Sequence, residues 1–370
     1  WEQRKLGEVV NVYDGVHQTP DYKDSGIMFL SVENIGTLKS KKYISEEAFN
    51  RDYKVYPQKG DILMTRIGDV GTPNVVETTE KMAFYVSLAL LKPINVDSYF
   101  LCDSILSPFF QNGLKERTLV TAIPQKINKD DIGKVSLFVP ISKDEQRQIG
   151  AFFTNINNLI TLHQRKYDKL TKVKKSMLEK MFPKNGATVP EIRFKGFSDA
   201  WEQRKLGEVA DIVGGGTPNT SISEFWDGDI DWYAPAEIAD QIYLTSSQRK
   251  ITEQGYNHSS TKMLPVGTVL FTSRAGIGKT AILSRKGCTN QGFQSIIPHK
   301  GELDSYFIFS RTGELKRYGE NVGAGSTFVE VSGKQMANME LMMPTTLLEQ
   351  KAIGQYFANL DNLITLHQRE

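Results

Sequence analysis

The nonapeptide WEQRKLGEV occupies residues 1–9 and recurs, letter for letter, at residues 201–209. The octapeptide NLITLHQR occupies residues 158–165 and recurs at residues 362–369. The two pairs are offset by 200 and 204 positions, so they belong to one tandem duplication. A repeat of this length is a whole domain and not a solenoid unit, and the sequence therefore predicts two related domains.

Similarity between the halves is uneven. KGDILMTRIGDVG (59–71) parallels VGTVLFTSRAGIG (266–278), VDSYFL parallels LDSYFI, and VSLFVPISKDEQRQIGAFF parallels MELMMPTTLLEQKAIGQYF. The loops between these segments hardly resemble each other. This profile predicts that the ends of the two halves make the same kind of contact twice. It also predicts that the middle of each half performs a different task.

Composition excludes several protein classes. With 39% hydrophobic and 24% charged residues, the 370-residue chain has the profile of ordinary globular domains, and no apolar run has membrane-spanning length. The two cysteines, Cys102 and Cys288, predict neither a disulfide framework nor a thiolate zinc site, and they fit a reducing, cytoplasmic location. The net charge is only +2, so any nucleic-acid binding depends on locally placed cations.

Periodicity predicts a mixed α/β fold with two long helices. Short apolar runs bounded by Gly or Pro, such as DILMT and TVLFT, are typical of strands. From residue 144 the apolar spacing becomes three and four, as along an antiparallel coiled coil with pseudo-two-fold symmetry. The predicted seam comprises Ile149, Phe152, Ile156, Leu159, Leu170, Ile353, Tyr356, Leu360 and Leu363.

The predicted organisation has five parts. They are a first domain at 1–143, a central spacer helix at 144–182, a linker at 183–200, a second domain at 201–347 and a C-terminal helix at 348–370. Compared with the first copy, we expect the second helix to be shortened and a segment before Trp1 to be missing.

Two enzyme-like motifs are incomplete. SRAGIGKT (273–280) resembles a phosphate-binding Walker loop, but Ser273 stands where that motif needs Gly. A glycine-rich hairpin end is favoured, with an NTP-dependent enzyme as the alternative. A nuclease-like set of Pro20, Asp21, Asp52 and Lys54 has long spacing, and its first carboxylate is replaced by Asn219 in the second half. The glycine-rich DIVGGGTPNT (211–220) is typical of a mobile surface loop.

No catalytic or metal-binding constellation is evident. The five histidines have no metal-ligand spacing, and the equivalent His163 and His367 predict a polar layer in the seam. The Asn/Asp-Pro-Pro-aromatic motif of amino-methyltransferases is absent. Residues 165–184 carry eight Lys or Arg against two carboxylates, which fits either a solvated helix face or a surface for phosphates or an acidic partner.

The chain resembles the specificity subunits of type I restriction-modification systems. The resemblance rests on the repeated WEQRKLGEV, the PEIRFKGFSDAW entry to the second half, the P…EQ…I…F helix starts and the GDILMTR and GTVLFTS strands, and it covers essentially the whole chain. It implies a non-catalytic subunit whose two target-recognition domains each read one half of a split double-stranded DNA target. It further implies that the helices space the domains and hold two methylation subunits, which bring S-adenosylmethionine and methylate adenine, while restriction subunits add ATP and Mg²⁺ chemistry. It implies no cofactor or metal bound by this chain.

Candidate base-reading residues are polar side chains beside Gly, Pro or strand ends, where a rigid scaffold presents loops to a DNA groove. The prediction comprises His17, Gln18, Arg66, Gln125 and Lys126 in the first domain and Asn219, Thr220, Arg274, Lys279 and Gln291 in the second. A solvated loop residue is the alternative for each. A duplicated protein–protein adaptor without DNA is the alternative for the whole chain.

Overall fold

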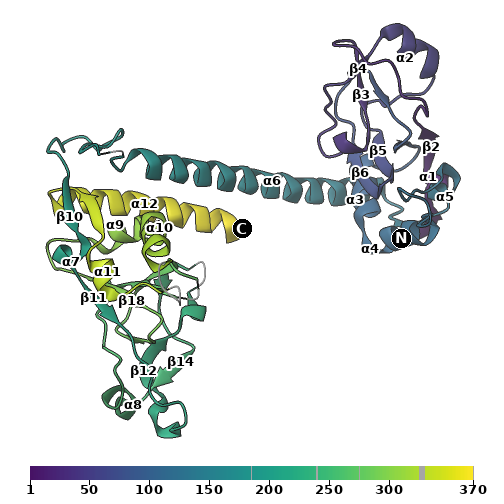
Figure 1. The fold of residues 1–370 in the computed structure, drawn as a ribbon. Helices are drawn as coiled ribbons and strands as arrows, with labels where there is room; N and C mark the ends of the chain where they lie inside the picture. Colours follow the sequence, from purple (N-terminus) through teal and green to yellow (C-terminus); the bar gives the residue numbers. More distant parts are fainter. Residues whose placement is uncertain (185, 239–240, 275, 325–329, 370) are drawn as a thin grey trace. The chain divides into compact units, whose positions relative to one another are not determined.

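The structure, a computed structural model, describes residues 1–184, 186–238, 241–274, 276–324 and 330–369 (Figure 1). The chain divides into two compact units, Trp1–Leu162 and His163–Glu370. The unit boundary falls inside one continuous helix, α6 (Lys143–Lys180), where the sequence predicts a spacer helix over residues 144–182. Among the described residues, no helix is both long and apolar enough to span a membrane.

The first unit contains a four-stranded antiparallel sheet in the order β2-β8-β5-β6 and a three-stranded sheet in the order β4-β3-β7. Strand β1 pairs with β9 outside both sheets. The strands are β1 (Glu2–Lys5), β2 (Val10–Asp14), β3 (Ile27–Leu30), β4 (Tyr43–Ile44), β5 (Ile62–Ile67), β6 (Asp69–Val75), β7 (Met82–Phe84), β8 (Leu88–Pro93) and β9 (Ser136–Val139). The helices that accompany them are α1 (Leu6–Val9), α2 (Glu46–Asp52), α3 (Ser98–Leu106), α4 (Pro108–Arg117) and α5 (Lys129–Gly133), with a 3-10 turn at Val32–Asn34.

The second unit repeats this plan. Its larger sheet has the order β11-β18-β15-β16-β13, its smaller sheet has the order β14-β12-β17, and β10 pairs with β19. The strands are β10 (Glu202–Lys205), β11 (Ala210–Gly214), β12 (Trp226–Tyr233), β13 (Tyr243–Leu244), β14 (Arg249–Ile251), β15 (Val269–Phe271), β16 (Thr280–Leu283), β17 (Cys288–Thr289), β18 (Gln294–Pro298) and β19 (Glu340–Met343). The helices are α7 (Leu206–Val209), α8 (Glu253–Asn257), α9 (Ser305–Ser310), α10 (Thr312–Gly323), α11 (Gly333–Ala337) and α12 (Leu347–Arg369), with 3-10 turns at Ser223–Phe225 and Pro235–Glu237.

The duplication extends into the centre of each domain, where the sequences differ most. In the smaller sheets, β3 pairs parallel with β7 and antiparallel with β4, and β12 pairs parallel with β17 and antiparallel with β14. The second domain differs by adding the edge strand β13. The divergent centres thus share the pairing of their small sheets, and they differ in the added strand β13 and in the loops.

The repeated frame docks each long helix through an equivalent glutamine. In the second unit, Gln350 accepts the Asp304 backbone N–H at 3.0 Å and donates to the Glu302 carbonyl at 2.9 Å, which joins α12 to the start of α9. In the first unit, Gln146 accepts the Asp97 N–H at 2.9 Å and donates to the Pro140 carbonyl at 2.8 Å. Both glutamines are 2% exposed, so each frame is closed by a buried and satisfied amide.

Glycine permits this close docking. A Cβ at Gly354 would lie 2.7 Å from a carboxylate oxygen of Asp304, and one at Gly150 would lie 2.7 Å from the backbone nitrogen of Phe100. Both distances are shorter than a Cβ tolerates. The repeated IG dipeptide after the helix starts therefore marks where each helix contacts the domain behind it.

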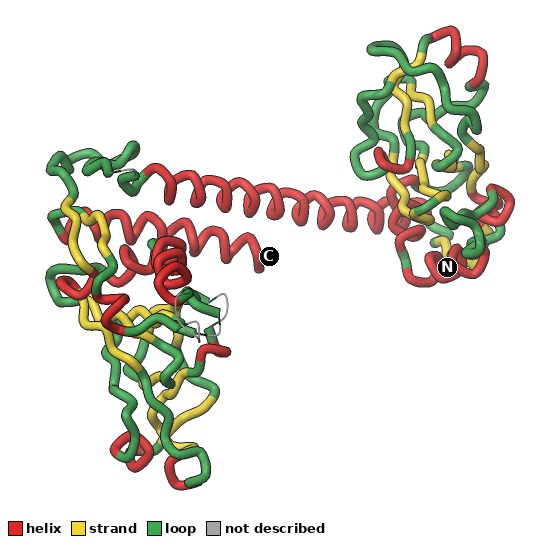
Figure 2. The backbone as a smooth tube through the Cα atoms, in the orientation of Figure 1, coloured by secondary structure: helices red, strands yellow, loops and turns green. Residues whose placement is uncertain are grey.

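In the second unit, α12 runs antiparallel beside the last part of α6 (Figure 2). His163 and His367 face each other with their Nδ1 atoms 3.1 Å apart, and Lys174 forms an ion pair with Asp361. The predicted polar layer of equivalent histidines is thus present. Ile353 and Leu360 of the predicted seam are buried, and Leu170 and Tyr356 pack against the same core.

Three predicted seam residues are exposed in the described chain, and their contact with a partner stays a prediction. Phe152 is 61%, Leu159 is 56% and Leu363 is 45% exposed. Ile149 instead packs against the core of the first domain, and Ile156 is half-buried. Heptad spacing identifies a stripe of apolar residues, but the partner that buries each part of the stripe depends on tertiary contacts.

Candidate nucleic-acid interface

In the first domain, the buried side chain of Arg66 ties three segments together. Arg66 lies near the end of β5, is 6% exposed and forms an ion pair with Asp14 at the end of β2. Its Nε donates to the Ile127 carbonyl at 3.1 Å. Removing one partner would leave a buried charge uncompensated, so this arrangement fixes the strand ends from which the surface loops emerge.

Two predicted residues, Gln125 and Lys126, lie close to Arg66 in the fold and have exposed side chains. The Gly68 N–H donates to the Gln125 carbonyl at 2.8 Å, and the Gln125 side chain donates back to the Gly68 carbonyl at 3.1 Å. Lys126 forms isolated bridges with Ile67 and Leu119. The structure therefore brings Gln125 and Lys126 against the turn between β5 and β6.

His17 and Gln18 lie in the loop that follows Asp14. They are exposed, and the loop is held where the Val16 N–H donates to the Phe84 carbonyl at 3.2 Å. Arg66 differs from these candidates because its guanidinium is occupied by internal acceptors. Its predicted contact with a base conflicts with this burial and would require the ion pair with Asp14 to open.

In the second domain, Ser273 occupies the place of Arg66. Its N–H donates to the Gly292 carbonyl at 2.8 Å, and its carbonyl accepts the Val331 N–H at 2.9 Å. The Thr217 hydroxyl donates to the side-chain oxygen of Gln291. The loop after β11, the turn after β15 and the turn before β18 are therefore linked to one another.

Four of the five candidates in this domain are exposed. Asn219, Thr220, Lys279 and Gln291 are exposed, whereas Arg274 is half-buried and its backbone forms an isolated antiparallel β-bridge with Glu330. The Asn219 carbonyl accepts the Trp226 indole N–H at 3.2 Å, and its side-chain oxygen accepts the Ser221 backbone N–H at 3.0 Å, so this exposed residue is held in a fixed loop.

The glycine-rich segment at 211–220 is fixed by a backbone hydrogen bond and close packing, which corrects the prediction of a mobile loop. Gly216 is buried and its N–H donates to the Thr289 carbonyl at 2.9 Å. A Cβ at Gly215 would lie 2.0 Å from the Asn290 carbonyl oxygen. The glycines therefore serve close backbone packing.

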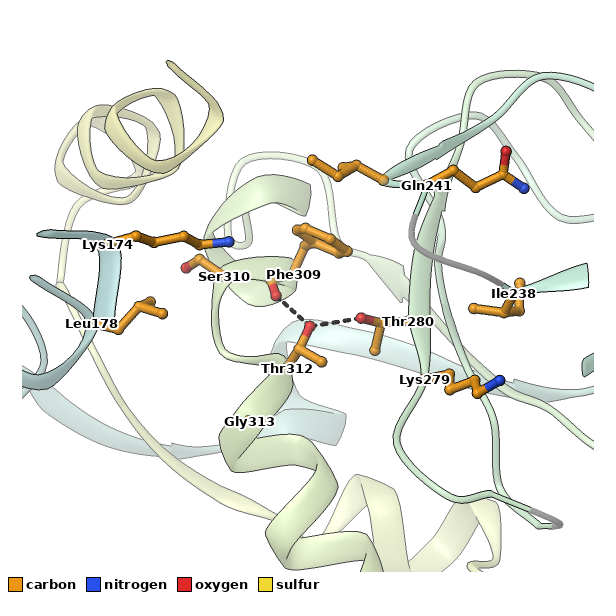
Figure 3. A pocket seen from close by; sticks show the side chains of 11 residues that line it. Lys174, Leu178, Ile238, Gln241, Lys279, Thr280, Phe309, Ser310, Thr312 and Gly313 are labelled. Carbon is orange, nitrogen blue, oxygen red and sulfur yellow. Dashed lines mark hydrogen bonds between the residues drawn. The ribbon is translucent and has the colours of Figure 1, made fainter. Parts of the chain in front are cut away.

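The Walker-loop alternative is wrong. Thr280 begins strand β16, whereas a Walker loop opens a helix whose N-terminus binds phosphate. Figure 3 shows Thr280 beside a pocket, with its side chain directed toward Thr312. The pocket has a volume of about 380 Å³, and the two hydroxyl oxygens lie 2.6 Å apart. The Thr312 hydroxyl also donates to the Phe309 carbonyl, and Ile238 and Leu178 line the same pocket. These residues form a partly apolar hollow without the backbone cradle that a triphosphate requires.

The nuclease alternative receives no support from the geometry. Asp21 pairs with Lys23 at 2.5 Å in the loop before β3, and Asp52 pairs with Arg51 at 2.8 Å at the end of α2. Within the described part of the chain, no three His, Cys, Asp or Glu side chains are placed to hold a metal ion. Each carboxylate is instead paired with a neighbouring cation.

Burial suppresses the nucleophilicity of both thiols. It raises the pKa of Cys102 to about 12 and that of Cys288 to about 11. The thiolate is the reactive form of cysteine, so both side chains are protonated and unreactive at neutral pH.

The structure adds a feature that sequence analysis missed. The loop after α4 exposes three apolar side chains beside Gln125, namely Leu119 (43%), Val120 (67%) and Ile123 (99%). The signal available in the sequence was the run TLVTAIPQK, whose apolar letters resemble those of a buried strand.

Comparison with known proteins agrees with this architecture. The model of the type I restriction modification DNA specificity domain matches residues 1–172 and again residues 198–370. The chain is 36% identical over 167 residues to the type I restriction enzyme MjaIX specificity subunit of Methanocaldococcus jannaschii, an alignment that covers 44% of this chain and 38% of that protein. It is 25% identical over 388 residues to the putative MjaX specificity subunit of the same organism, covering 100% of this chain and 89% of the relative.

A solved structure shares the fold. The type I restriction-modification S subunit of M. genitalium superposes with a TM-score of 0.63 at 12% identity, covering 100% of this chain and 91% of that one. The two family matches coincide with the two structural repeats and together span nearly the whole sequence. The chain therefore belongs to the family of type I restriction-modification DNA specificity proteins, with one specificity domain in each half.

Proposed function

We propose that this chain is the non-catalytic subunit that gives a type I restriction-modification complex its DNA sequence specificity. Each domain reads one half of an asymmetric, bipartite duplex target. The observation that carries the proposal is the contrast between the two repeats, which share one topology and equivalent helix docking but carry different side chains on the loops. Two similar frames suit two copies of one partner, and two different loop sets suit two different half-sites.

The chemistry is assigned to partner subunits. Two methylation subunits dock on the frames and long helices and bring S-adenosylmethionine for adenine methylation, and restriction subunits bring ATP and Mg²⁺. This chain contributes position and sequence discrimination. Major-groove contacts from Gln, Asn, Arg and Lys side chains supply the discrimination, and cations near phosphates supply affinity.

A domain chimera tests this division. Strands β2 and β11 begin at Val10 and Ala210, and β9 and β19 begin at Ser136 and Glu340, so residues 10–136 can replace residues 210–340 at equivalent strand starts. In cells that carry the methylation subunit, the natural chain should mark an asymmetric split sequence. The chimera should mark an inverted repeat of the first half-site, with one modified adenine in each half.

Three outcomes distinguish the proposal from its rivals. If the folded chimera still marks the original asymmetric sequence, base reading lies outside the exchanged segment. If the wild-type complex shows no salt-dependent binding to duplex DNA, the chain is an adaptor. Methyl transfer by the purified chain alone would contradict the non-catalytic assignment.

A further inference from the structure

The loop between α4 and α5 presents an apolar tip to solvent. Residues 119–124 include Leu119, Val120 and Ile123, which expose 43%, 67% and 99% of their surface. A single exposed apolar side chain is ordinary, but three within five residues form a local patch. A loop that needed only to connect two helices would leave this surface polar.

Hydrogen bonds hold the two ends of the loop that carries the apolar tip. The Leu119 N–H donates to the Lys126 carbonyl at 2.7 Å, the Lys126 N–H donates back at 3.4 Å, and the Ala122 N–H donates to the Leu119 carbonyl at 3.3 Å. Gln125 joins the second end of the loop to Gly68 through hydrogen bonds of its backbone and of its side chain. The ends of the loop are thus attached to the scaffold that Arg66 holds.

Polar and cationic groups adjoin the tip. Gln125 and Lys126 are exposed and follow Ile123 by two and three residues, while Arg117 lies at the end of α4 before the loop. An amide, a cation and an apolar surface side by side match the three kinds of chemistry that a DNA groove offers, namely base-edge hydrogen bonds, phosphates and apolar base surface.

We propose that residues 119–124 form the apolar part of the DNA-reading surface of the first domain and that Ile123 determines base preference at one position of the first half-site. This inference rests on the proposed function. The ligand is apolar base surface, which is either a thymine methyl in the major groove or the face of a base pair exposed by a wedge in the minor groove. Ile123 would then distinguish one base from another by apolar contact alone, without a charged or polar group.

The test compares Ile123→Ala with Leu106→Ala in the full chain assembled with its methylation subunit. Leu106 is a matched control because it is an apolar side chain 51% exposed in the same unit, at the end of α3 and outside the repeated segments. Both variants should keep the wild-type unfolding temperature and partner assembly. Ile123→Ala should weaken binding to the mapped target about tenfold and leave binding to a duplex with a scrambled first half-site unchanged. Leu106→Ala should match wild type on both duplexes.

Modified duplexes separate the two sources of apolar surface. If Ile123 contacts a thymine methyl, one thymine-to-uracil exchange in the first half-site weakens wild-type binding and has no further effect on Ile123→Ala. If Ile123 wedges between base pairs, uracil has no effect. A 2-aminopurine at the opened step then fluoresces more with wild type than with Ile123→Ala.

The proposal is overturned if Ile123→Ala binds and methylates like Leu106→Ala. It is also overturned if Ile123→Ala lowers the fraction of chain assembled with the methylation subunit while the assembled fraction binds DNA normally, because the tip then contacts protein. Absence of sequence preference in the wild-type complex is a different result, since it refutes the proposed function itself.

Discussion

Glu349 connects the linker to the second domain through a single side chain. It accepts two hydrogen bonds from Arg193, at 2.7 and 2.8 Å, and one from the Trp201 indole at 3.2 Å. Glu349 is 1% exposed, and its hydrogen bonds to Arg193 raise the pKa of that guanidinium. The repeat places Glu145 beside Trp1 at 2.8 Å, where Trp1 is 63% exposed. The same Trp–Glu pair therefore lies in a buried and in an exposed setting within one chain.

This contrast predicts unequal costs for one substitution. Glu349→Gln leaves the sheltered Arg193 without its counter-charge and should lower the free energy of unfolding of the second unit by about 3 kcal/mol. Glu145→Gln, at an exposed position, should cost less than about 1 kcal/mol. Urea unfolding of both variants measures the difference, and equal costs would show that Arg193 finds another acceptor.

Asp103 predicts a pH dependence of stability. Its Oδ2 is buried without a hydrogen-bond partner among the described residues, and desolvation raises the pKa of its carboxyl from 3.8 to about 6. The folded state therefore prefers the protonated form, so its contribution to stability is present below about pH 4 and is lost as pH rises through about 6.

Asp103→Asn should consequently stabilise the first unit by about 1 kcal/mol at pH 7, a figure reduced for the partial exposure of the group. The gain should vanish near pH 4. Thermal unfolding across this pH range compares the two proteins, and a gain that is the same at both ends would assign the effect to something other than ionisation.

At the scale of elements, the docking of α12 depends on Gly354. A Cβ there would lie 2.7 Å from the Asp304 carboxylate that caps α9 and 3.1 Å from the Phe307 nitrogen. Gly354→Ala should therefore lower the free energy of unfolding by about 2 kcal/mol, even though alanine favours a helix. Gly313→Ala is the matched control, because this glycine in α10 has nothing within 4 Å of an added Cβ. The control should be neutral or slightly stabilising, and a Gly354 variant that behaves the same way would mean that α12 shifts without cost.

Sequence periodicity and repetition predicted the elements better than their burial. Both long helices and the pairing of His163 with His367 follow from spacing and from the repeated NLITLHQR. The exposure of Phe152 and the burial of Arg66 do not, because each depends on residues far away in the chain. The matching topology of the small sheets was also hidden, since β3 and β12 share pairing partners but few letters. Which loop residues contact bases stays a prediction.

At the scale of the whole molecule, α6 is continuous between the two units and should act as a ruler. Four residues inserted near Thr154 would lengthen the helix by about 6 Å, at about 1.5 Å per residue. With a rise of about 3.4 Å per base pair, we expect a nonspecific spacer longer by one or two base pairs and unchanged half-sites. Methylation mapping of the insertion variant reads both quantities, and altered half-site letters would show that the helix itself reads sequence.

The packing of residues 163–182 has a consequence for chain connectivity. This segment, the last part of α6 and the two residues after it, belongs to the second compact unit, where Lys174 pairs with Asp361 and Phe182 contacts Trp201, Phe307 and Phe357. The exposed turn at Gly186 follows it, and Arg193 then ties the next segment to Glu349. Covalent continuity at that turn is therefore redundant for holding the fold together. Two polypeptides that end and begin at Gly186 should reassociate without a peptide bond between them, so the two domains could be supplied by separate chains and paired combinatorially.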